Sequence, residues 1–344
     1  MKVAIREMEN RCEAVFTNVG VAQEDAGILA RVLLETEMRG VFTHGIFRVP
    51  KYVDCIQKNG IKTESRLQLI ADTPSWALAD GQGGLGIVLS HKAMRLAIEK
   101  AKQTGVGIVN VRNSHHFGAA GYYSGMCADE KMIGIAMSNG DALIAATGSR
   151  VRSIGNNPFS FASPAGKYDK VVYDIAMSGS SDIKILKMAE EGKLLPPGWI
   201  IDKEGRQTLD PAEYQKGGTL LPFGGYKGYG MAMMVEILGA VLSGAAMTTD
   251  VHAWNTVPGQ SGNVGHFFMA LDVEKITPER DYEARMEKLI DGIKACDKTA
   301  DADEIYYPGE IELRKLRRCL ESGFVDVADD TMERFAEVEQ RLGI

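Results

Sequence analysis

Two short segments of the sequence place histidines beside side chains that can move protons or bind carboxylates. The first contains Thr43, His44 and Arg48, and the second contains the pair His115 and His116. A histidine gains and loses a proton near neutral pH, so His44 can act as a general acid or base. The planar guanidinium of Arg48 can hold a carboxylate through two hydrogen bonds. This combination indicates proton transfer next to a bound carboxylate, although a single loop histidine is more often a structural residue.

The backbone around these residues decides whether they can act together. One turn of helix would place His44 and Arg48 on the same face, but Pro50 disfavours helix at the residue before it. The second segment, residues 113–118, directly follows a predicted strand over residues 106–111. Loops at such strand ends often carry catalytic groups.

Neither the histidines nor the cysteines form a metal-binding pattern. The side chains of adjacent residues diverge, and no carboxylate or cysteine lies at ligand spacing from His115 and His116, so we predict no metal site. The N-terminal segment mixes charged and apolar residues, unlike a signal peptide. The five cysteines are widely scattered, and none are spaced as in a zinc site or a redox dithiol: Cys12, Cys55, Cys127, Cys296 and Cys319. This usage fits a reducing compartment, so we expect a cytoplasmic protein.

Two glycine clusters are candidates for holding a cofactor phosphate. Residues 81–86 match the Gly-x-Gly-x-x-Gly dinucleotide fingerprint between a predicted strand and a predicted helix. The acidic residue expected at the end of the next strand is absent, and Arg112 there could instead meet a ribose 2′-phosphate. The second cluster, residues 224–230, carries Lys227 before an apolar segment, which suits either an anion site or a tight turn.

Composition excludes several classes of protein. The 344 residues carry 39 basic and 46 acidic side chains, a formal net charge of −7, which argues against a nucleic-acid partner. Apolar residues make up 45% of the chain, enough for a large core. The most apolar run, residues 230–247, contains Glu236 and lacks basic residues after it, so we predict a buried helix and no membrane partner.

The hydrophobic pattern predicts a mixed α/β fold. Residues 5–40 are predicted to be helical with a loop at 18–23, and strands alternate with helices from Trp76 onwards. Strands are predicted at residues 76–80, 106–111, 133–138, 159–162, 170–175 and 264–273. Helices are predicted at residues 88–102, 121–131 and 183–191, with three more after residue 278. We expect Asp329 or Asp330 to cap the last helix and a loop at 196–210.

Five separated segments combine into one recognisable pattern. They are residues 39–45 with Arg48, 113–121, 155–159, 222–230 and 307–310. Their order and spacing, which cover nearly the whole chain, resemble the malate/L-lactate dehydrogenase type 2 family. That family includes ureidoglycolate, sulfolactate and 2,3-diketogulonate oxidoreductases and a cyclic-imine carboxylate reductase.

The resemblance implies a nicotinamide-dependent oxidoreductase, using NAD or NADP, whose cofactor domain is not a Rossmann fold. It therefore counts against a phosphate site at residues 81–86. It implies an α/β layer domain for the nicotinamide cofactor and a helical domain built from N-terminal, middle and C-terminal segments. We expect this division: a first helical part at residues 1–72, a first α/β part at 73–179, a helical segment with the Lys227 turn at 180–247, a second α/β part at 248–304, and C-terminal helices packing on the helical domain at 305–344. Family members are commonly homodimers, so a homodimer is expected here.

The resemblance also implies roles for individual residues. His44 corresponds to the family's proton donor, and Thr43 and Asp182 correspond to a relay beside it. Arg48 corresponds to the arginine that binds the substrate carboxylate. Further substrate contacts are expected from Tyr52, His116 and Asn156. Cofactor contacts are expected from His116, Phe117, Gly118, Ala119, Ala120, Gly121, Asp174, Ile175, Ala176, Lys227, Gly228, Pro308, Gly309 and Glu310.

Three positions depart from the family pattern. Thr43 replaces the usual serine, Asn156 stands where threonine is common, and Met177 stands where a small polar residue is usual. Thr43 keeps the hydroxyl but adds a methyl group, which stiffens the rotamer and narrows the pocket. These changes preserve the chemistry and leave the substrate open.

We therefore predict hydride transfer between a nicotinamide and a small 2-hydroxy or 2-oxo acid. In the reduction direction, a positively charged His44 stabilised by Asp182 would protonate the carbonyl oxygen. Reduction of a cyclic imine carboxylate or of a diketo sugar acid is the alternative within the family. Outside it, the alternatives are a hydrolase that uses Thr43, His44 and Asp182 as a nucleophilic relay, and a non-catalytic binding protein.

Overall fold

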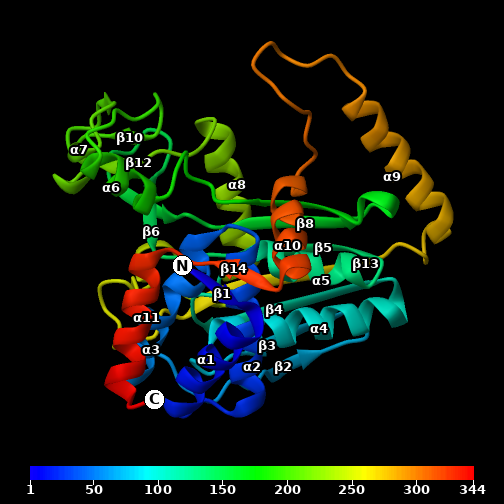
Figure 1. Ribbon diagram of the computed structural model, residues 1–344, viewed down its shortest axis with the longest axis horizontal. Helices are drawn as coiled ribbons and strands as arrows, with labels where there is room; N and C mark the ends of the chain where they lie inside the picture. Colours follow the sequence, from blue (N-terminus) through cyan, green and yellow to red (C-terminus); the bar gives the residue numbers. More distant parts are fainter.

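The computed structural model describes residues 1–344 and is built around one large sheet that crosses the centre of the molecule (Figure 1). Its seven strands have the order β2-β3-β4-β13-β5-β8-β9. They span Gln68–Asp72 (β2), Trp76–Asp80 (β3), Val106–Ser114 (β4), Val264–Asp272 (β13), Met132–Ser138 (β5), Phe159–Pro164 (β8) and Lys170–Ile175 (β9). Only β3 and β4 are parallel neighbours, and every other pair in this sheet is antiparallel. Because a Rossmann sheet is mostly parallel, this topology confirms the predicted mixed α/β class without a Rossmann domain.

Helices cover both faces of the large sheet because successive side chains of a strand point to opposite sides. Phe268 belongs to the larger core, which includes residues of α4 (Gly86–Thr104) and α5 (Ala120–Asp129). Its neighbour Phe267 belongs to a second core, which includes residues of α8 (Tyr226–Glu236). A one-residue slip would exchange the two cores, so this double coverage fixes the register of the sheet.

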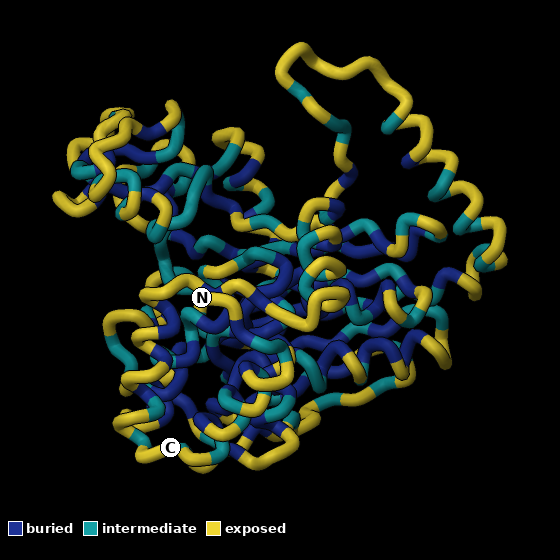
Figure 2. The backbone as a smooth tube through the Cα atoms, viewed as in Figure 1, coloured by how far each residue is buried: buried dark blue, intermediate teal, exposed yellow.

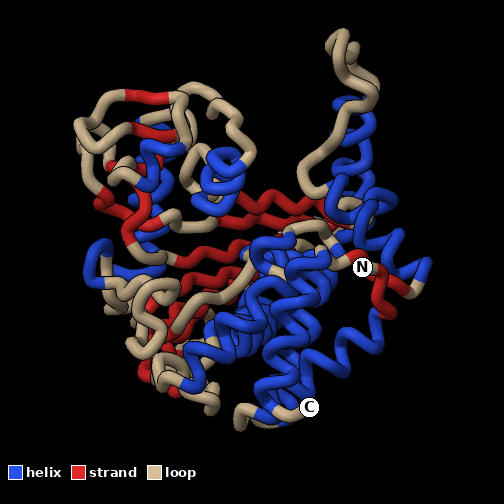
Figure 3. The backbone as a smooth tube through the Cα atoms, turned by 60° about the vertical axis from the view of Figure 1, so that its left-hand side comes forward, coloured by secondary structure: helices blue, strands red, loops and turns tan.

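The two ends of the chain form one helical layer beside the sheet (Figure 3). Its helices are α1 (Ile5–Asn18), α2 (Gln23–Met38), α3 (Val49–Gln57), α10 (Glu310–Ser322) and α11 (Asp329–Leu342). α11 packs against α1 and α3, and α10 packs against α2. β1 (Lys2–Ala4) pairs with β14 (Phe324–Asp326) in a separate two-stranded sheet. The loop that carries His44 contacts α2 and α11, so both chain ends hold it in place.

The glycines at residues 81–86 allow close packing of backbone on backbone. A Cβ atom on Gly86 would lie 2.1 Å from the carbonyl oxygen of His115, and one on Gly84 would lie 2.9 Å from that of Glu64. Because these glycines lack a Cβ atom, the start of α4 can pack closely against the loop that follows β4. None of these glycines lines the pocket described below.

A smaller lobe stands beside the large sheet and is exposed over much of its surface (Figure 2). It contains a five-stranded sheet of order β11-β10-β12-β6-β7 with α6 (Asp182–Glu190) and α7 (Ala212–Gln215). The strands are β6 (Ala142–Ala145), β7 (Arg152–Gly155), β10 (Ile200–Ile201), β11 (Gln207–Thr208) and β12 (Thr219–Leu220). Residues 180–247 thus contain three strands besides helices, and the predicted loop at 196–210 contains two of them. Strands of two residues are too short to leave a period in the sequence.

The apolar segment at residues 230–247 is not the buried helix that the sequence predicts. α8 ends at Glu236, a π-helical turn follows at Ile237–Val241, and only part of the segment is buried. Ile237 and Leu242 are 49% and 58% exposed. When a helix has apolar residues on every face, its sequence does not show which face is exposed to solvent. No helix in the structure has the length and apolar character that a membrane crossing requires.

Three helices follow residue 278, as the sequence predicts, namely α9 (Glu279–Lys294), α10 and α11. α9 and the loop after it project from the body and are mostly exposed (Figures 1 and 2). The last helix lacks the predicted side-chain cap, because Ala328 stands at the capping position. Asp329 is already helical, and its carboxylate lies 2.8 Å from the N-terminal amine of Met1.

Candidate active site

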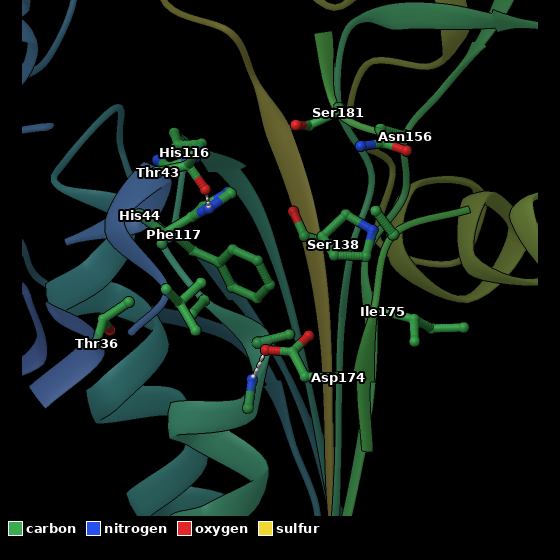
Figure 4. A pocket seen from close by; sticks show the side chains of 18 of the residues that line it. Thr36, Thr43, His44, His116, Phe117, Ser138, Asn156, Asp174, Ile175 and Ser181 are labelled. Carbon is green, nitrogen blue, oxygen red and sulfur yellow. Dashed lines mark hydrogen bonds between the residues drawn. The ribbon is translucent and has the colours of Figure 1, made fainter. Parts of the chain in front are cut away.

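A pocket of about 760 Å³ is lined both by the helical layer and by strands of the large sheet. Figure 4 shows Thr43, His44 and His116 near one end of it, and Thr36 with Asp174 near the other. We call these the His44 end and the Asp174 end. A long pocket of this kind can hold a ligand that reaches from one group of residues to the other.

His44 is held by a tight loop between α2 and α3. Two 3-10 turns, Phe42–His44 and Ile46–Arg48, form this loop, and the second continues directly into α3. The residue before Pro50 is helical, contrary to the expectation, because Pro50 lies in the first turn of α3, where a missing N–H is tolerated. The buried carboxylate of Glu37 accepts a hydrogen bond of 2.9 Å from the first N–H of the second turn. This contact ties the loop to α2.

The side chain of His44 has one hydrogen-bond partner, the hydroxyl of Thr43. Thr43 Oγ1 lies 2.9 Å from His44 Nδ1. Burial, reinforced by the nearby charge of Arg48, lowers the pKa of His44 to about 3. Both effects favour the neutral imidazole. The positively charged His44 expected in the reduction direction stays a prediction.

Arg48 presents its guanidinium to the same end of the pocket. Its Nε donates a hydrogen bond of 2.6 Å to the carbonyl oxygen of Thr43, and its Cζ lies 5.4 Å from the ring centre of Trp254. Neither terminal nitrogen has a hydrogen-bond partner in the protein. The inner nitrogen is thus fixed, while the outer edge remains free to bind a carboxylate.

The ring of His116 stacks on Trp254 and lies beside His44. The His116 and Trp254 ring centres are 4.3 Å apart, and those of His116 and His44 are 5.6 Å apart. Tyr52, expected as a substrate contact, is fully buried and does not line the pocket. Its hydroxyl lies 2.6 Å from His116 Nδ1. Tyr52 therefore orients His116, and burial lowers the pKa of His116 well below its ordinary value.

The wall opposite His44 carries Asn156 and Ser181 (Figure 4). Asp182 follows Ser181 in the chain and also lines the pocket. Asn156 Oδ1 and Asp182 Oδ1 each accept a hydrogen bond from a nearby backbone N–H, at 2.9 and 2.8 Å. Asp182 is the first residue of α6. No hydrogen bond joins Asp182 to His44 or Thr43, so the expected relay is not formed in this structure. The catalytic role of Asp182 stays a prediction.

The Asp174 end brings together segments that are far apart in the sequence. Residues 116–121 follow β4, and residues 174–176 end β9. The N–H of Gly121 donates a hydrogen bond of 2.6 Å to Asp174 Oδ2 (Figure 4), so this carboxylate caps the start of α5. The other carboxylate oxygen remains available to a ligand.

The N-terminus of α10 reaches the same end of the pocket. Gly309 precedes the helix with a φ of 87°, and a Cβ atom there would lie 2.7 Å from the carbonyl oxygen of Val172. Ile311 and Glu312 line the pocket, and their backbone N–H groups have no hydrogen-bond partner. Free N–H groups at a helix start attract anions such as phosphate.

Three residues expected to contact the cofactor do not line this pocket. Lys227 is exposed at the start of α8. Gly228 is buried, and a Cβ atom there would lie 2.2 Å from the carbonyl oxygen of Phe223. Glu310 turns away from the pocket, and both of its oxygens lie 2.9 Å from Lys294 Nζ. The other expected cofactor contacts do line the pocket, namely residues 116–121, 174–176 and 308–309.

Sequence reasoning missed several residues of the pocket. Ser138 faces the cavity (Figure 4), and its Oγ lies 2.9 Å from Nδ1 of the buried His266, whose Nε2 lies 2.7 Å from Ser114 Oγ. Asp141 and Trp254 also line the pocket. Ser138 and Asp141 lie at the end of a predicted strand, a position that often carries binding residues, so the sequence could have suggested them. His266 and Trp254 come from distant segments, which leave no local signal. No group of three or more His, Cys, Asp or Glu side chains is arranged to hold a metal ion.

Comparison with known proteins identifies the family of this chain. The family model described as malate/L-lactate dehydrogenase matches residues 3–336. The chain belongs to the malate/L-lactate dehydrogenase family. This match confirms, over nearly the whole chain, the resemblance that the five short segments carry.

Relatives in the family agree in both sequence and structure. A malate dehydrogenase of Pyrococcus abyssi is 40% identical over 337 residues, which cover 96% of this chain and 92% of that protein. An L-sulfolactate dehydrogenase of Methanothermobacter thermautotrophicus is 34% identical, and the match covers 100% of this chain and 98% of that protein. The solved structure of sulfolactate dehydrogenase from Methanocaldococcus jannaschii superposes with a TM-score of 0.93 at 33% identity, covering 100% of this chain and 98% of that one. The family fold is therefore present along the full chain.

Proposed function

We propose that this chain is a nicotinamide-dependent oxidoreductase that transfers hydride between the cofactor and C2 of a small 2-hydroxy or 2-oxo acid. One observation carries the proposal. A single pocket has a histidine and a free guanidinium at one end and uncapped helix N–H groups at the other. Membership of a dehydrogenase family supports the same class of reaction.

The residues of the pocket fit a nicotinamide dinucleotide. The volume of about 760 Å³ lies within the range of ~300–1,000 Å³ that is usual for small-molecule and cofactor sites. The free N–H groups of Ile311 and Glu312 suit a phosphate, and the open oxygen of Asp174 suits a ribose hydroxyl. Residues 116–121 continue from there towards His44. When bound, the nicotinamide supplies or accepts the hydride.

Arg48 would bind the substrate carboxylate with its two free nitrogens and so fix the neighbouring carbon. The carbonyl oxygen of Thr43 holds its inner nitrogen, and the ring of Trp254 supports the plane of the guanidinium. A lysine could not reproduce the two parallel hydrogen bonds, because its ammonium group is a single point charge.

His44 would move the proton at the substrate oxygen. In the oxidation direction the hydride leaves C2, a C=O bond forms, and Nε2 of the neutral His44 takes the hydroxyl proton. The lowered pKa of His44 suits this direction, because the neutral ring is present at neutral pH. In the reverse direction, the substrate carboxylate neutralises the positive charge of Arg48, which is one cause of the lowered pKa of His44. The pKa of His44 therefore rises and the protonated ring is favoured. The Thr43 hydroxyl keeps the ring in position.

The charges at the Asp174 end favour NAD over NADP. The carboxylates of Asp174 and Glu312 line this end, whereas the nearby Arg39 is paired with Glu35 at 2.7 Å. A carboxylate accepts hydrogen bonds from ribose hydroxyls and repels a 2′-phosphate. We therefore propose NAD as the preferred cofactor.

A homodimer in the cytoplasm is the form in which we propose that the enzyme works. The segment from α8 to the end of the apolar run exposes Met233, Met234, Ile237, Val241, Leu242 and Met247. A group of exposed apolar side chains in one segment is typical of a subunit interface. Light scattering should give twice the chain mass of 37.4 kDa, and a monomer at all concentrations would contradict the dimer. The five unpaired cysteines fit the reducing cytoplasm.

The hydrogen bond between Thr43 and His44 keeps a hydrolase as a second candidate. A hydroxyl 2.9 Å from an imidazole nitrogen is the arrangement of a nucleophile and its base. Asp182, the third member of such a relay, makes no hydrogen bond to His44. The free helix N–H groups at the other end of the same pocket suit a cofactor phosphate, which a hydrolase does not need, and they favour the oxidoreductase.

A single assay separates these functions. Purified protein is mixed with NADH or NADPH and with pyruvate, oxaloacetate, a cyclic imine carboxylate or a diketo sugar acid, and absorbance of the reduced cofactor is followed. We expect oxidation of NADH with at least one of these acids. Ester or amide hydrolysis that needs no nicotinamide would favour the hydrolase. Absence of both reactions and of nicotinamide binding would contradict the proposed function.

A further inference from the structure

Two carboxylates in the lining of the pocket form no ion pair. Asp141 and Asp182 both line the pocket, and neither takes part in an ion pair. They are close enough that Asp182, in addition to burial, raises the pKa of Asp141. This part of the pocket is therefore acidic.

Arg48 is the only unpaired arginine or lysine that lines the pocket. Arg39 is the only other arginine or lysine that lines the pocket, and it is paired with Glu35 at 2.7 Å. Asp182 acts electrostatically on Arg48. The pocket lining thus combines one unpaired cation with two unpaired acids.

A buried imidazole gives an independent sign that a polar ligand belongs in this pocket. His115 lines it and is 1% exposed, and neither of its ring nitrogens has a hydrogen-bond partner. Buried polar atoms without a partner are rare, and beside a pocket they indicate a bound ligand or water. The pocket therefore suits a substrate with polar groups beyond the reacting carbon.

We propose that Asp141 selects substrates by charge. A 2-hydroxy or 2-oxo acid whose far end carries N–H donors, as an amide or an ammonium group, is preferred over one that ends in a second acid group. This inference rests on the proposed function and narrows its substrate class. The carboxylate of the substrate binds Arg48, and its N–H donors pair with Asp141 across the pocket. Arg152 acts on Asp141 from outside the pocket lining. A second carboxylate would therefore face Asp141 and Asp182 with no unpaired cation in the lining to bind it.

L-malate and its 4-amide form a matched pair for the test, because they differ only in the far group. We compare kcat/KM for their oxidation with NAD. The amide should be favoured by at least about tenfold, which corresponds to about 1.4 kcal/mol. Asp141→Asn removes the charge at nearly constant shape, so the preference should fall to about threefold or less.

A matched control removes a negative charge elsewhere. Glu190 lies on α6 and is exposed outside the pocket. The Glu190→Gln variant should therefore prefer the amide over L-malate as strongly as the unchanged protein does. Calorimetric titration of each acid into the cofactor-free protein measures the same preference without turnover.

The outcomes separate the two proposals. An equal or higher kcat/KM for L-malate, or an unchanged preference in Asp141→Asn, would overturn the selection by charge. If neither acid is oxidised with NAD or NADP, but calorimetry gives the amide preference and its loss in Asp141→Asn, then the proposed reaction fails and the selection by charge stands.

Discussion

At the His44 end of the pocket the working groups are side chains from one short loop, whereas at the Asp174 end they are backbone N–H groups of α10 together with a carboxylate from β9. His44 and Arg48 are held by contacts within their own loop and with α2. Ile311 and Glu312 offer free N–H groups at the start of α10, and Asp174, which accepts the N–H of Gly121 through one oxygen, offers its other oxygen. A side chain is lost with a single substitution, but a backbone group is not. We therefore expect changes at the first end to affect turnover, and charge changes at the second to adjust nucleotide affinity.

The largest effect is expected from His44→Ala. This change removes the proton-transfer group, so kcat should fall by about a hundred- to ten-thousandfold. The dissociation constant for NADH, measured by fluorescence titration, should change by less than about twofold, because His44 binds no part of the phosphate end. A variant that loses NADH affinity while keeping kcat would break the distinction between the two ends.

Arg48→Lys tests the same end through binding. The charge is kept but the two-pronged contact is lost, so KM for the acid should rise by about ten- to a hundredfold, with a smaller change in kcat. Arg66→Lys, at an exposed arginine outside the pocket, is the control and should behave like the unchanged protein. An unaltered KM in Arg48→Lys would show that the carboxylate binds elsewhere.

Glu312→Arg tests the Asp174 end. Replacing a carboxylate with a guanidinium should strengthen NADPH binding by about tenfold and leave kcat with saturating NADH nearly unchanged. Glu321→Arg, exposed on the same helix, controls for the general change in charge. The unchanged protein should bind NADH more tightly than NADPH, and the reverse order in a titration would contradict the assignment of this end.

The smallest effect concerns the loop that carries His44. Burial raises the pKa of Glu37 from 4.5 to about 7, so the folded chain keeps this proton at pH values where the unfolded chain has lost it. The free energy of unfolding should therefore decrease as pH rises from about 4.5 to 7, by about 1–3 kcal/mol from this group. Glu37→Gln should remove that part of the decrease in urea unfolding at pH 5 and pH 8. Parallel pH dependences in the two proteins would contradict this origin.

The sequence predicts the His44 end better than the Asp174 end for a physical reason. His44 and Arg48 act through side chains four residues apart, so both their types and their spacing are visible in the sequence. Phosphate partners at the other end are backbone N–H groups, which every sequence possesses. Lys227 drew attention as a cation beside glycines, yet it lies outside the pocket.

The fold shows the same limit of local patterns. Long strands such as β4, β5 and β13 were predictable because they contain enough residues to show a pattern. The two-residue strands β10, β11 and β12 depend on pairing across the smaller lobe and leave no such pattern. Contacts such as Ser138 with His266 likewise arise only when distant strands become neighbours.

Transfer of deuterium is the most direct test of the account. The protein is incubated with NADH that carries deuterium at the transferred position and with a 2-oxo acid, and the product is analysed by mass spectrometry and NMR. We predict a 2-hydroxy acid with deuterium bound to C2, and almost none of it with His44→Ala over the same time. Product without deuterium at C2, or equal labelling by the unchanged protein and His44→Ala, would contradict the proposed hydride and proton transfer.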